Sequence, residues 1–256
     1  MKISILGAGA FGTALGGVLA GNGYDIDYYD STLERESLKD NLAASAYVIL
    51  CVPSKVAPHL LPHLDKNQPL IVTTKGLITD SYFADFTDWM VLSGPGFAAD
   101  IKEKKPTKFT ITDPRIKALF EADYIEYDST TDRRGVLMCG GLKNVYALLA
   151  GYHHLTPQTA EWQDYILAAS KEMKSLLELN SANPETVDLA CGIGDLELTC
   201  TKGSRNYTYG YRVKDDKSYQ PECTVEGLSA IKRIRRGEIK IEKDLPILSE
   251  ILEIFN

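Results

Sequence analysis

The feature that most constrains the fold is a glycine-rich segment close to the amino terminus. Gly7, Gly9 and Gly12 are spaced as G-x-G-x-x-G, between an apolar run at 2–6 that predicts a strand and a small-residue stretch at 13–21 that predicts a helix. In a dinucleotide-binding turn the first glycine permits the tight turn, the second lets the backbone approach a pyrophosphate, and the third lets helix and strand pack closely. The helix amino terminus would then offer free N–H groups to the phosphates.

An acidic residue follows at a suitable distance. The stretch 24–29 predicts a second strand, and Asp30 ends it, 18 residues after Gly12. A carboxylate there would accept hydrogen bonds from the adenosine ribose hydroxyls and repel a 2′-phosphate, which favours NAD over NADP. Arg35 is close enough in sequence to leave NADP open, and a plain turn role for Asp30 is the alternative.

The rest of the chain reads as an α/β protein with a helical second half. Short strands are predicted at 47–52, 70–74, 89–92 and 109–112, and their alternation with helices predicts a doubly wound parallel sheet, the Rossmann architecture. After about residue 128 the apolar residues take helical spacing, at 136–151, 157–179, 184–189 and 224–236. We therefore predict a dinucleotide-binding Rossmann domain at 1–128 and an all-helical, substrate-binding domain at 129–256.

Composition excludes several classes of function. The net charge is −7 over 256 residues, which disfavours nucleic acid and anionic membranes as partners. No stretch of about 18 apolar residues predicts a membrane span, and the first twenty residues are better explained by the glycine motif than by a signal peptide. The five cysteines form no C-x-x-C pair, so neither a metal site nor a disulfide framework is expected. The cytoplasm is the expected location.

Two lysines, Lys75 and Lys143, occupy positions typical of ligand-binding or catalytic residues. Lys75 follows the strand predicted at 70–74, and ligands of open α/β sheets bind outside the carboxyl ends of the strands. Lys143 lies in an otherwise apolar helix, where an ammonium is costly unless it is paired or used. The alternatives are a solvated loop lysine for Lys75 and a lysine that reaches solvent along its stem for Lys143.

A third polar group lies later in the chain. It comprises Asp195, Thr199, and Ser204-Arg205-Asn206 in a glycine-bounded region. Arg205 and Asn206 offer several donors for a phosphate or carboxylate, and Ser204 is a candidate cap for a following helix. An ordinary capped helix start is the alternative.

These segments together resemble the NAD(P)-dependent glycerol-3-phosphate dehydrogenase family. The similar stretches occur in the family's order and are GAGAFGTALG (7–16), VILCVPS (48–54), TKGL (74–77), LSGPGFAADI (92–101), GGLKNVYALLAG (140–151), GIGDLELTC (192–200), SRN (204–206) and VEG (225–227). The resemblance implies reversible reduction of dihydroxyacetone phosphate to sn-glycerol 3-phosphate, with the site between a Rossmann and a helical domain.

The resemblance also implies roles for individual residues. The catalytic set would be Lys143, the proton-transfer residue, with Lys75 and Asp195. The substrate-binding set would be Lys75, Gly94, Gly96, Lys143, Asn144, Asp195, Thr199, Ser204, Arg205 and Asn206. The cofactor-binding set would be Gly7, Gly9, Ala10, Phe11, Gly12, Asp30, Lys75, Ala98, Arg205, Thr224 and Glu226.

The chain departs from the family pattern in several places. Gly96 stands where the family usually has serine, threonine or asparagine, the usual GALKN reads GGLKN, and Tyr207 replaces a frequent arginine. The loop after the second strand lacks a usual Asn-x-x-Tyr-Leu-Pro-Gly stretch, and the carboxyl terminus is short, which bears on oligomerisation and on any substrate lid. The oligomeric state stays open, a homodimer included.

Two other functions remain in view. A related reductase with a Rossmann and a helical domain would act on another small carbonyl compound, such as a hydroxy acid, ketopantoate or pyrroline carboxylate. A non-catalytic NAD-sensing module would need only the glycine segment, so Lys75, Lys143 and Asp195 argue against it.

Overall fold

The computed structural model describes residues 1–30, 38–242 and 244–255. Its contacts divide the chain into two compact units. The N-terminal unit comprises Met1–Lys75 and Asp80–Arg133, and the C-terminal unit comprises Gly76–Thr79 and Arg134–Asn256. Each unit is described by itself below.

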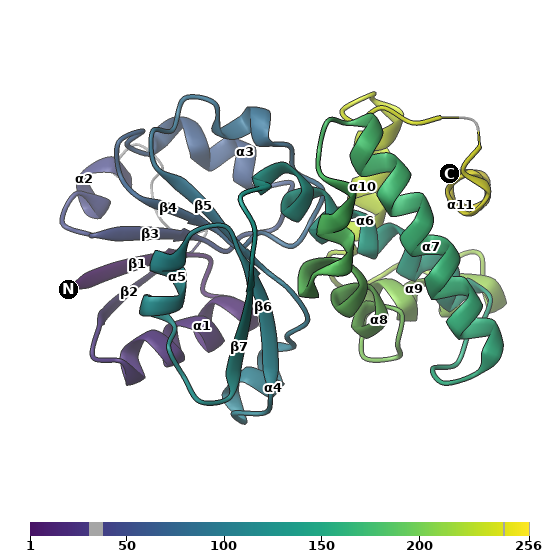
Figure 1. Ribbon diagram of the computed structural model, residues 1–256, viewed down its shortest axis with the longest axis horizontal. Helices are drawn as coiled ribbons and strands as arrows, with labels where there is room; N and C mark the ends of the chain where they lie inside the picture. Colours follow the sequence, from purple (N-terminus) through teal and green to yellow (C-terminus); the bar gives the residue numbers. More distant parts are fainter. Residues whose placement is uncertain (31–37, 243, 256) are drawn as a thin grey trace. The chain divides into compact units, whose positions relative to one another are not determined.

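A seven-stranded sheet forms the centre of the N-terminal unit (Figure 1). Its strands run in the order β2-β1-β3-β4-β5-β6-β7. They are β1 (Lys2–Leu6), β2 (Asp25–Tyr29), β3 (Tyr47–Leu50), β4 (Leu70–Val72), β5 (Trp89–Ser93), β6 (Thr107–Ile111) and β7 (Ile125–Ser129). The predicted α/β class with a mainly parallel sheet is confirmed, and the predicted domain boundary near Asp128–Ser129 falls at the end of β7.

Two features of the sheet differ from the sequence-based prediction. β6 runs antiparallel to β5, although a wholly parallel sheet was expected. The connection 94–106 holds the short helix α4 (Ala98–Lys102). The equally long connection 112–124 returns β7 parallel to β6, so the length of the connection does not by itself set the direction of β6. β7 was not predicted at all, because its sequence IEYDS has no apolar run and it lies half-exposed at the sheet edge.

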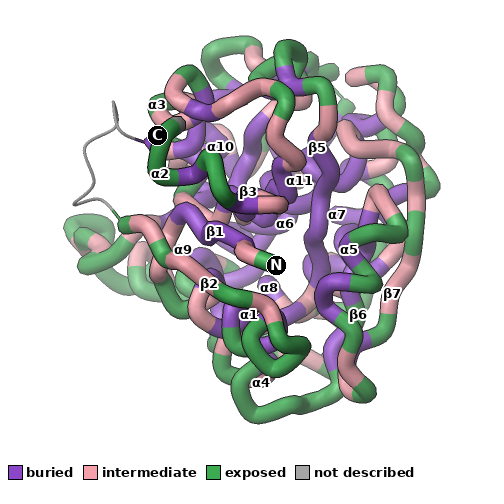
Figure 2. The backbone as a smooth tube through the Cα atoms, turned by 90° about the vertical axis from the view of Figure 1, so that its left-hand side faces the viewer, coloured by how far each residue is buried: buried purple, intermediate pink, exposed green. Residues whose placement is uncertain are grey.

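Helices cover both faces of this sheet. On one face lie α1 (Ala10–Gly21), α4 and α5 (Pro114–Leu119), and on the other lie α2 (Leu38–Leu42) and α3 (Ala57–Leu60) (Figure 1). The first face closes over an apolar core that includes Ile5, Leu15, Ile71, Ile101 and Ile116. The inner strands are accordingly buried while β2 and β7, at the edges, are more exposed (Figure 2). Because helices cover both faces of the sheet, the edge at the carboxyl ends of the inner parallel strands is where a ligand site is expected.

The C-terminal unit is helical throughout its described part. Its elements are α6 (Arg133–Tyr152), α7 (Ala160–Leu179), a 3-10 turn (Pro184–Asp188), a π turn (Ala190–Gly194), α8 (Asp195–Thr199), α9 (Arg205–Asp215), α10 (Glu226–Arg235) and α11 (Pro246–Ile254). α6 is buried along nearly its whole length, so the other helices pack around it. The helix predicted from 157 begins at Ala160, because the Thr159 side chain accepts a hydrogen bond from Trp162 N at 3.2 Å and caps it.

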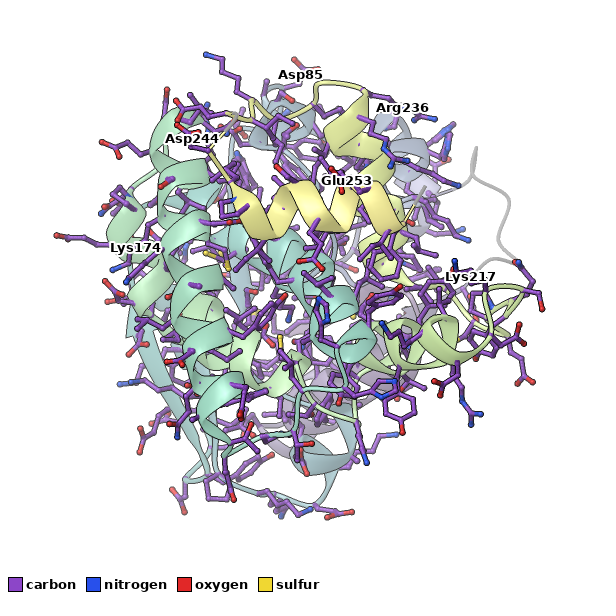
Figure 3. The ribbon with its side chains drawn as sticks, turned by 90° about the vertical axis from the view of Figure 1, so that its right-hand side faces the viewer. Asp85, Lys174, Lys217, Arg236, Asp244 and Glu253 are labelled. Atoms are coloured by element: carbon purple, nitrogen blue, oxygen red, sulfur yellow. The ribbon has the colours of Figure 1, made fainter. Side chains whose placement is uncertain are left out.

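The last helix is fixed by a buried carboxylate. Glu172 of α7 accepts hydrogen bonds from the backbone N–H groups of Ile247 at 2.7 Å and Leu248 at 3.0 Å, in the first turn of α11. The Tyr146 hydroxyl donates a third bond to Glu172, at 3.1 Å. Figure 3 shows α11 between the labelled Asp244, just before it, and Glu253, in its last turn.

No helix in the described residues is long and apolar enough to cross a membrane.

Candidate active site

The glycine segment forms the turn that was predicted between β1 and α1. Gly7 has φ +111°, a conformation that L side chains rarely adopt, and an added Cβ would lie 2.6 Å from the Cys51 carbonyl oxygen. Gly12 is buried inside α1, where a Cβ would lie 2.1 Å from the Gly7 carbonyl oxygen. Both positions therefore require glycine for the turn to close against the sheet.

The same turn leaves room for a ligand at the start of α1. Gly9 is the N-cap of this helix, and a Cβ at Gly9 would meet no atom within 4 Å. The first turn of the twelve-residue helix, which begins at Ala10, carries no acidic side chain to oppose an anion. Open space, free backbone N–H groups and the positive end of the helix dipole fit a pyrophosphate.

Asp30 lies beside this turn. It directly follows β2, which pairs in parallel with β1, and Gly7 N donates to the Tyr29 carbonyl at 2.8 Å. Its side chain is exposed, as a contact to ribose hydroxyls requires. Arg35, which left NADP open, lies outside the described residues.

Lys75 is held by three groups of the N-terminal unit. It follows β4, and its Nζ donates to the carbonyl oxygens of Gly94 at 3.4 Å and Gly96 at 3.1 Å. The Phe11 ring centroid lies 4.3 Å from the same nitrogen. Lys75 is half-buried, so it is not simply a solvated loop lysine. These contacts gather the glycine segment, the end of β4 and the loop after β5 at one place.

Gly96 and Cys51 lie close to Lys75 in sequence-distant segments of the same unit. A Cβ at Gly96 would lie 3.1 Å from the Phe109 ring, so Phe109 occupies the room that a larger residue at 96 would need. Ala98 begins α4 just beyond this loop. Cys51 lies at the carboxyl end of β3, and burial raises the pKa of its thiol, opposed by a hydrogen bond with Thr73 and by the Lys75 charge. The thiol thus stays neutral at pH 7.

In the C-terminal unit, Lys143 is buried and paired. Lys143 of α6 is 2% exposed, and Asp195, the first residue of α8, is 1% exposed. The Lys143 ammonium donates to the Asp195 carboxylate. The alternative in which Lys143 reaches solvent along its stem is wrong. An ion pair this deeply buried is expensive to maintain, and such groups cluster at functional sites.

Thr199 continues this polar group. Its hydroxyl donates to the Asp195 carbonyl oxygen at 2.5 Å, one turn along α8, and its side chain is buried. The bond ties the Thr199 side chain to the residue that pairs with Lys143.

Two asparagines join three helices of the same unit. The Asn206 amide donates to the Asn144 side-chain oxygen at 2.7 Å, and the Asn206 side-chain oxygen accepts from Gly227 N at 2.9 Å. The Asn144 amide donates to the Gly140 carbonyl at 3.0 Å. Both residues therefore have packing contacts that the sequence did not reveal, since 62 positions separate them. Their contact with substrate stays a prediction.

Arg205 stands at the exposed start of α9. The Ser204 hydroxyl accepts from Asn206 N at 3.2 Å and Tyr207 N at 3.5 Å, which confirms the predicted cap. A pocket of about 130 Å³ adjoins this helix start, and its lining includes Ser204, Arg205, Tyr209, Tyr219 and Val225. Thr224 is half-buried, and Glu226 is buried in the first turn of α10.

The chain is similar to one family along most of its length. Residues 132–256 match the model described as the NAD-dependent glycerol-3-phosphate dehydrogenase C-terminus. The NAD(P)+ glycerol-3-phosphate dehydrogenase of Teredinibacter turnerae is 29% identical over 99% of this chain and 90% of its own. That of Alcanivorax borkumensis is 27% identical over 98% and 88%.

A solved structure shows the same fold. The crystal structure of the Coxiella burnetii glycerol-3-phosphate dehydrogenase covers 100% of this chain and 94% of its own, with a TM-score of 0.83 and 22% identity. Its fold is shared over both units of this chain. The chain is therefore similar over nearly its whole length to NAD(P)+ glycerol-3-phosphate dehydrogenases, and its C-terminal residues match the model of that family's C-terminus.

Proposed function

We propose that the protein catalyses the reversible, NAD(P)H-dependent reduction of dihydroxyacetone phosphate to sn-glycerol 3-phosphate. The observation that carries this proposal is the buried Lys143–Asp195 pair. Apolar residues of similar size are often as stable as a buried charge pair or more so, and stability alone is therefore weak grounds for the pair. A lysine in this position serves a reaction that moves a proton.

The cofactor supplies the electrons. Bound NADH would supply the hydride that reduces the C2 carbonyl carbon of the substrate. Gly7, Gly9, Ala10 and Gly12 would hold the pyrophosphate through the turn and the first N–H groups of α1, and Asp30 would bind the adenosine ribose. The open space at Gly9 supports this assignment.

Lys143 would handle the proton. As hydride reaches C2, the C2 oxygen gains negative charge, and the Lys143 ammonium stabilises it and transfers a proton to give the alcohol. In the reverse direction neutral Lys143 removes that proton. Asp195 accepts a hydrogen bond from Lys143 and so holds the lysine nitrogen at one position. Thr199 is the neighbouring hydroxyl in the proposed substrate site.

Two cations would bind the substrate itself. Lys75, fixed by the Gly94 and Gly96 carbonyls, would donate to the substrate's oxygen atoms. The exposed Arg205 guanidinium at the start of α9 would bind the phosphate. We also propose that the enzyme works in the cytoplasm as a homodimer, which light scattering at assay concentration would test.

The deciding assay follows NADH oxidation at the nicotinamide absorbance band with dihydroxyacetone phosphate. Unphosphorylated dihydroxyacetone is the matched substrate control, and NADPH in parallel tests the preference ascribed to Asp30. We expect turnover that requires the phosphate, and Arg205→Ala should chiefly raise KM for the phosphorylated substrate. Binding of NADH without turnover of any phosphorylated ketone would overturn the proposal in favour of a sensor or of another carbonyl substrate.

A further inference from the structure

The contacts around Lys75 join the cofactor turn to a residue of the proposed reaction. Phe11 is the second residue of α1, one position after Ala10 in the glycine segment. Its ring centroid lies 4.3 Å from the Lys75 Nζ. That nitrogen also donates to the Gly96 carbonyl at 3.1 Å and the Gly94 carbonyl at 3.4 Å. The ammonium thus has an aromatic face and two carbonyl oxygens around it.

The carbonyl oxygens and the aromatic ring act on the Lys75 ammonium in different ways. Two carbonyl oxygens accept hydrogen bonds and set the direction of two N–H groups. A ring within about 6 Å of an ammonium attracts it through the negative face of its π system, and Phe11 therefore holds the charge without using a lysine proton. A lysine side chain has four rotatable bonds and much rotamer freedom to lose, so such a contact has a large effect on where the nitrogen resides.

We propose that Phe11 is a positioning residue for the reaction: its ring keeps the Lys75 ammonium at the carboxyl end of β4, ready for the substrate's oxygen atoms. This role rests on the proposed function of Lys75, and it differs from contact with the cofactor, for which the backbone at Phe11 would suffice. All of the groups involved belong to the N-terminal unit. Phe11 is half-buried at the turn, so its ring also borders the place where the cofactor would bind.

The kinetic test is a double-mutant cycle between Phe11 and Lys75. Phe11→Leu keeps an apolar side chain and removes the ring, and we expect kcat/KM for dihydroxyacetone phosphate to fall about 5- to 30-fold, the range of a partly desolvated cation–π contact. Phe11→Tyr keeps the ring and should stay within about twofold of wild type. In a Lys75→Met background, Phe11→Leu should cost less than about twofold, because its partner is gone.

The chain supplies its own matched control. Lys66 Nζ lies 4.0 Å from the Phe86 ring, a similar contact elsewhere in the same unit. Phe86→Leu should leave kcat/KM per folded enzyme unchanged. If Phe11→Leu costs the same with and without Lys75, or if Phe11→Tyr fails to restore activity, the ring acts on cofactor or fold and the proposal is overturned.

A second readout needs no turnover. The protein is produced with ¹³C-lysine, which leaves the ammonium unmodified, and the Lys75 ¹Hε–¹³Cε resonance is assigned by its loss in Lys75→Arg. We expect an upfield ring-current shift of that resonance in wild type and in Phe11→Tyr, and none in Phe11→Leu. If the chemical shift of Lys75 is the same in wild type and in Phe11→Leu, the proposal is overturned. If the Lys75 shift depends on the ring but the protein fails to reduce dihydroxyacetone phosphate, then Phe11 does position Lys75 and the proposed function is refuted instead.

Discussion

Removing the two charges of the buried pair, singly and together, tests why the C-terminal unit contains it. The changes are Lys143→Met, Asp195→Leu and the double substitution. Each single change leaves the other charge at about 2% exposure or less without its counterion. Breaking a buried pair in this way costs about 3–5 kcal/mol of unfolding free energy. Replacing both members by apolar residues is often neutral or stabilising, so the double variant should lie within about 1 kcal/mol of wild type.

Stability and activity should therefore separate. The double variant is expected to be about as stable as wild type and yet inactive, since loss of a general acid/base lowers kcat by roughly 10²–10⁴-fold. The singles should be both unstable and inactive. Each single change costs about 3–5 kcal/mol and the double change about zero, so removing the second partner should recover what removing the first one cost. The coupling free energy of the cycle should therefore be about 6–10 kcal/mol in magnitude.

Urea unfolding followed by tryptophan fluorescence measures this cycle. The chain has two tryptophans, and Trp89→Phe leaves Trp162 of α7, whose indole N–H donates to the Cys200 carbonyl at 3.1 Å, to report on the C-terminal unit. Equal m values across the variants are the control for comparable unfolding. A coupling below about 1 kcal/mol, or a double variant with near-normal turnover, would refute the reasoning.

Three further substitutions probe other contacts. Gly12→Ala should weaken NADH binding and lower the Tm of the N-terminal unit, because its Cβ would meet the Gly7 carbonyl at 2.1 Å; unchanged titration of NADH fluorescence would contradict this. Glu172→Leu should destabilise the C-terminal unit by about 2–4 kcal/mol, since two buried N–H groups of α11 lose their acceptor, and faster amide exchange in that helix would show it. Arg115→Met should cost about 1 kcal/mol at pH 7, because Arg115 holds the pKa of Asp88 below its usual value. That contribution is present above the unfolded pKa of the carboxyl and is lost as pH falls through the folded pKa. The stability curves of variant and wild type should therefore converge once the pH lies below the lowered pKa of Asp88.

The sequence determined those features whose cause is local. The glycine spacing dictated a turn that only residues without a side chain can close, as Gly7 and Gly12 show. The apolar stretch around Lys143 favoured a paired or chemically used ammonium over one that reaches solvent, and the structure has a buried ion pair. Ser204 before a polar helix indicated a cap, because capping depends on neighbours two and three residues away.

Tertiary structure decided what depends on partners distant in the chain. The family resemblance placed Lys143 and Asp195 in one catalytic set, but the residues around Lys143 did not indicate a bond to Asp195, 52 positions away. Likewise, the residues around Asn206 did not indicate its bond to Asn144. β6 runs antiparallel to β5 although an equally long connection returns β7 parallel to β6, so the direction of β6 could not be read from the length of its connection. β7 formed at an edge where pairing rather than burial supports a polar strand. The ring of Phe11 meets Lys75 only because parallel strands bring their carboxyl ends together. Local backbone geometry depends on neighbours a few residues away, so the sequence alone indicates which residue a position tolerates. Contacts between distant residues depend on how the helices and strands pack, so only the tertiary structure shows which group each residue meets.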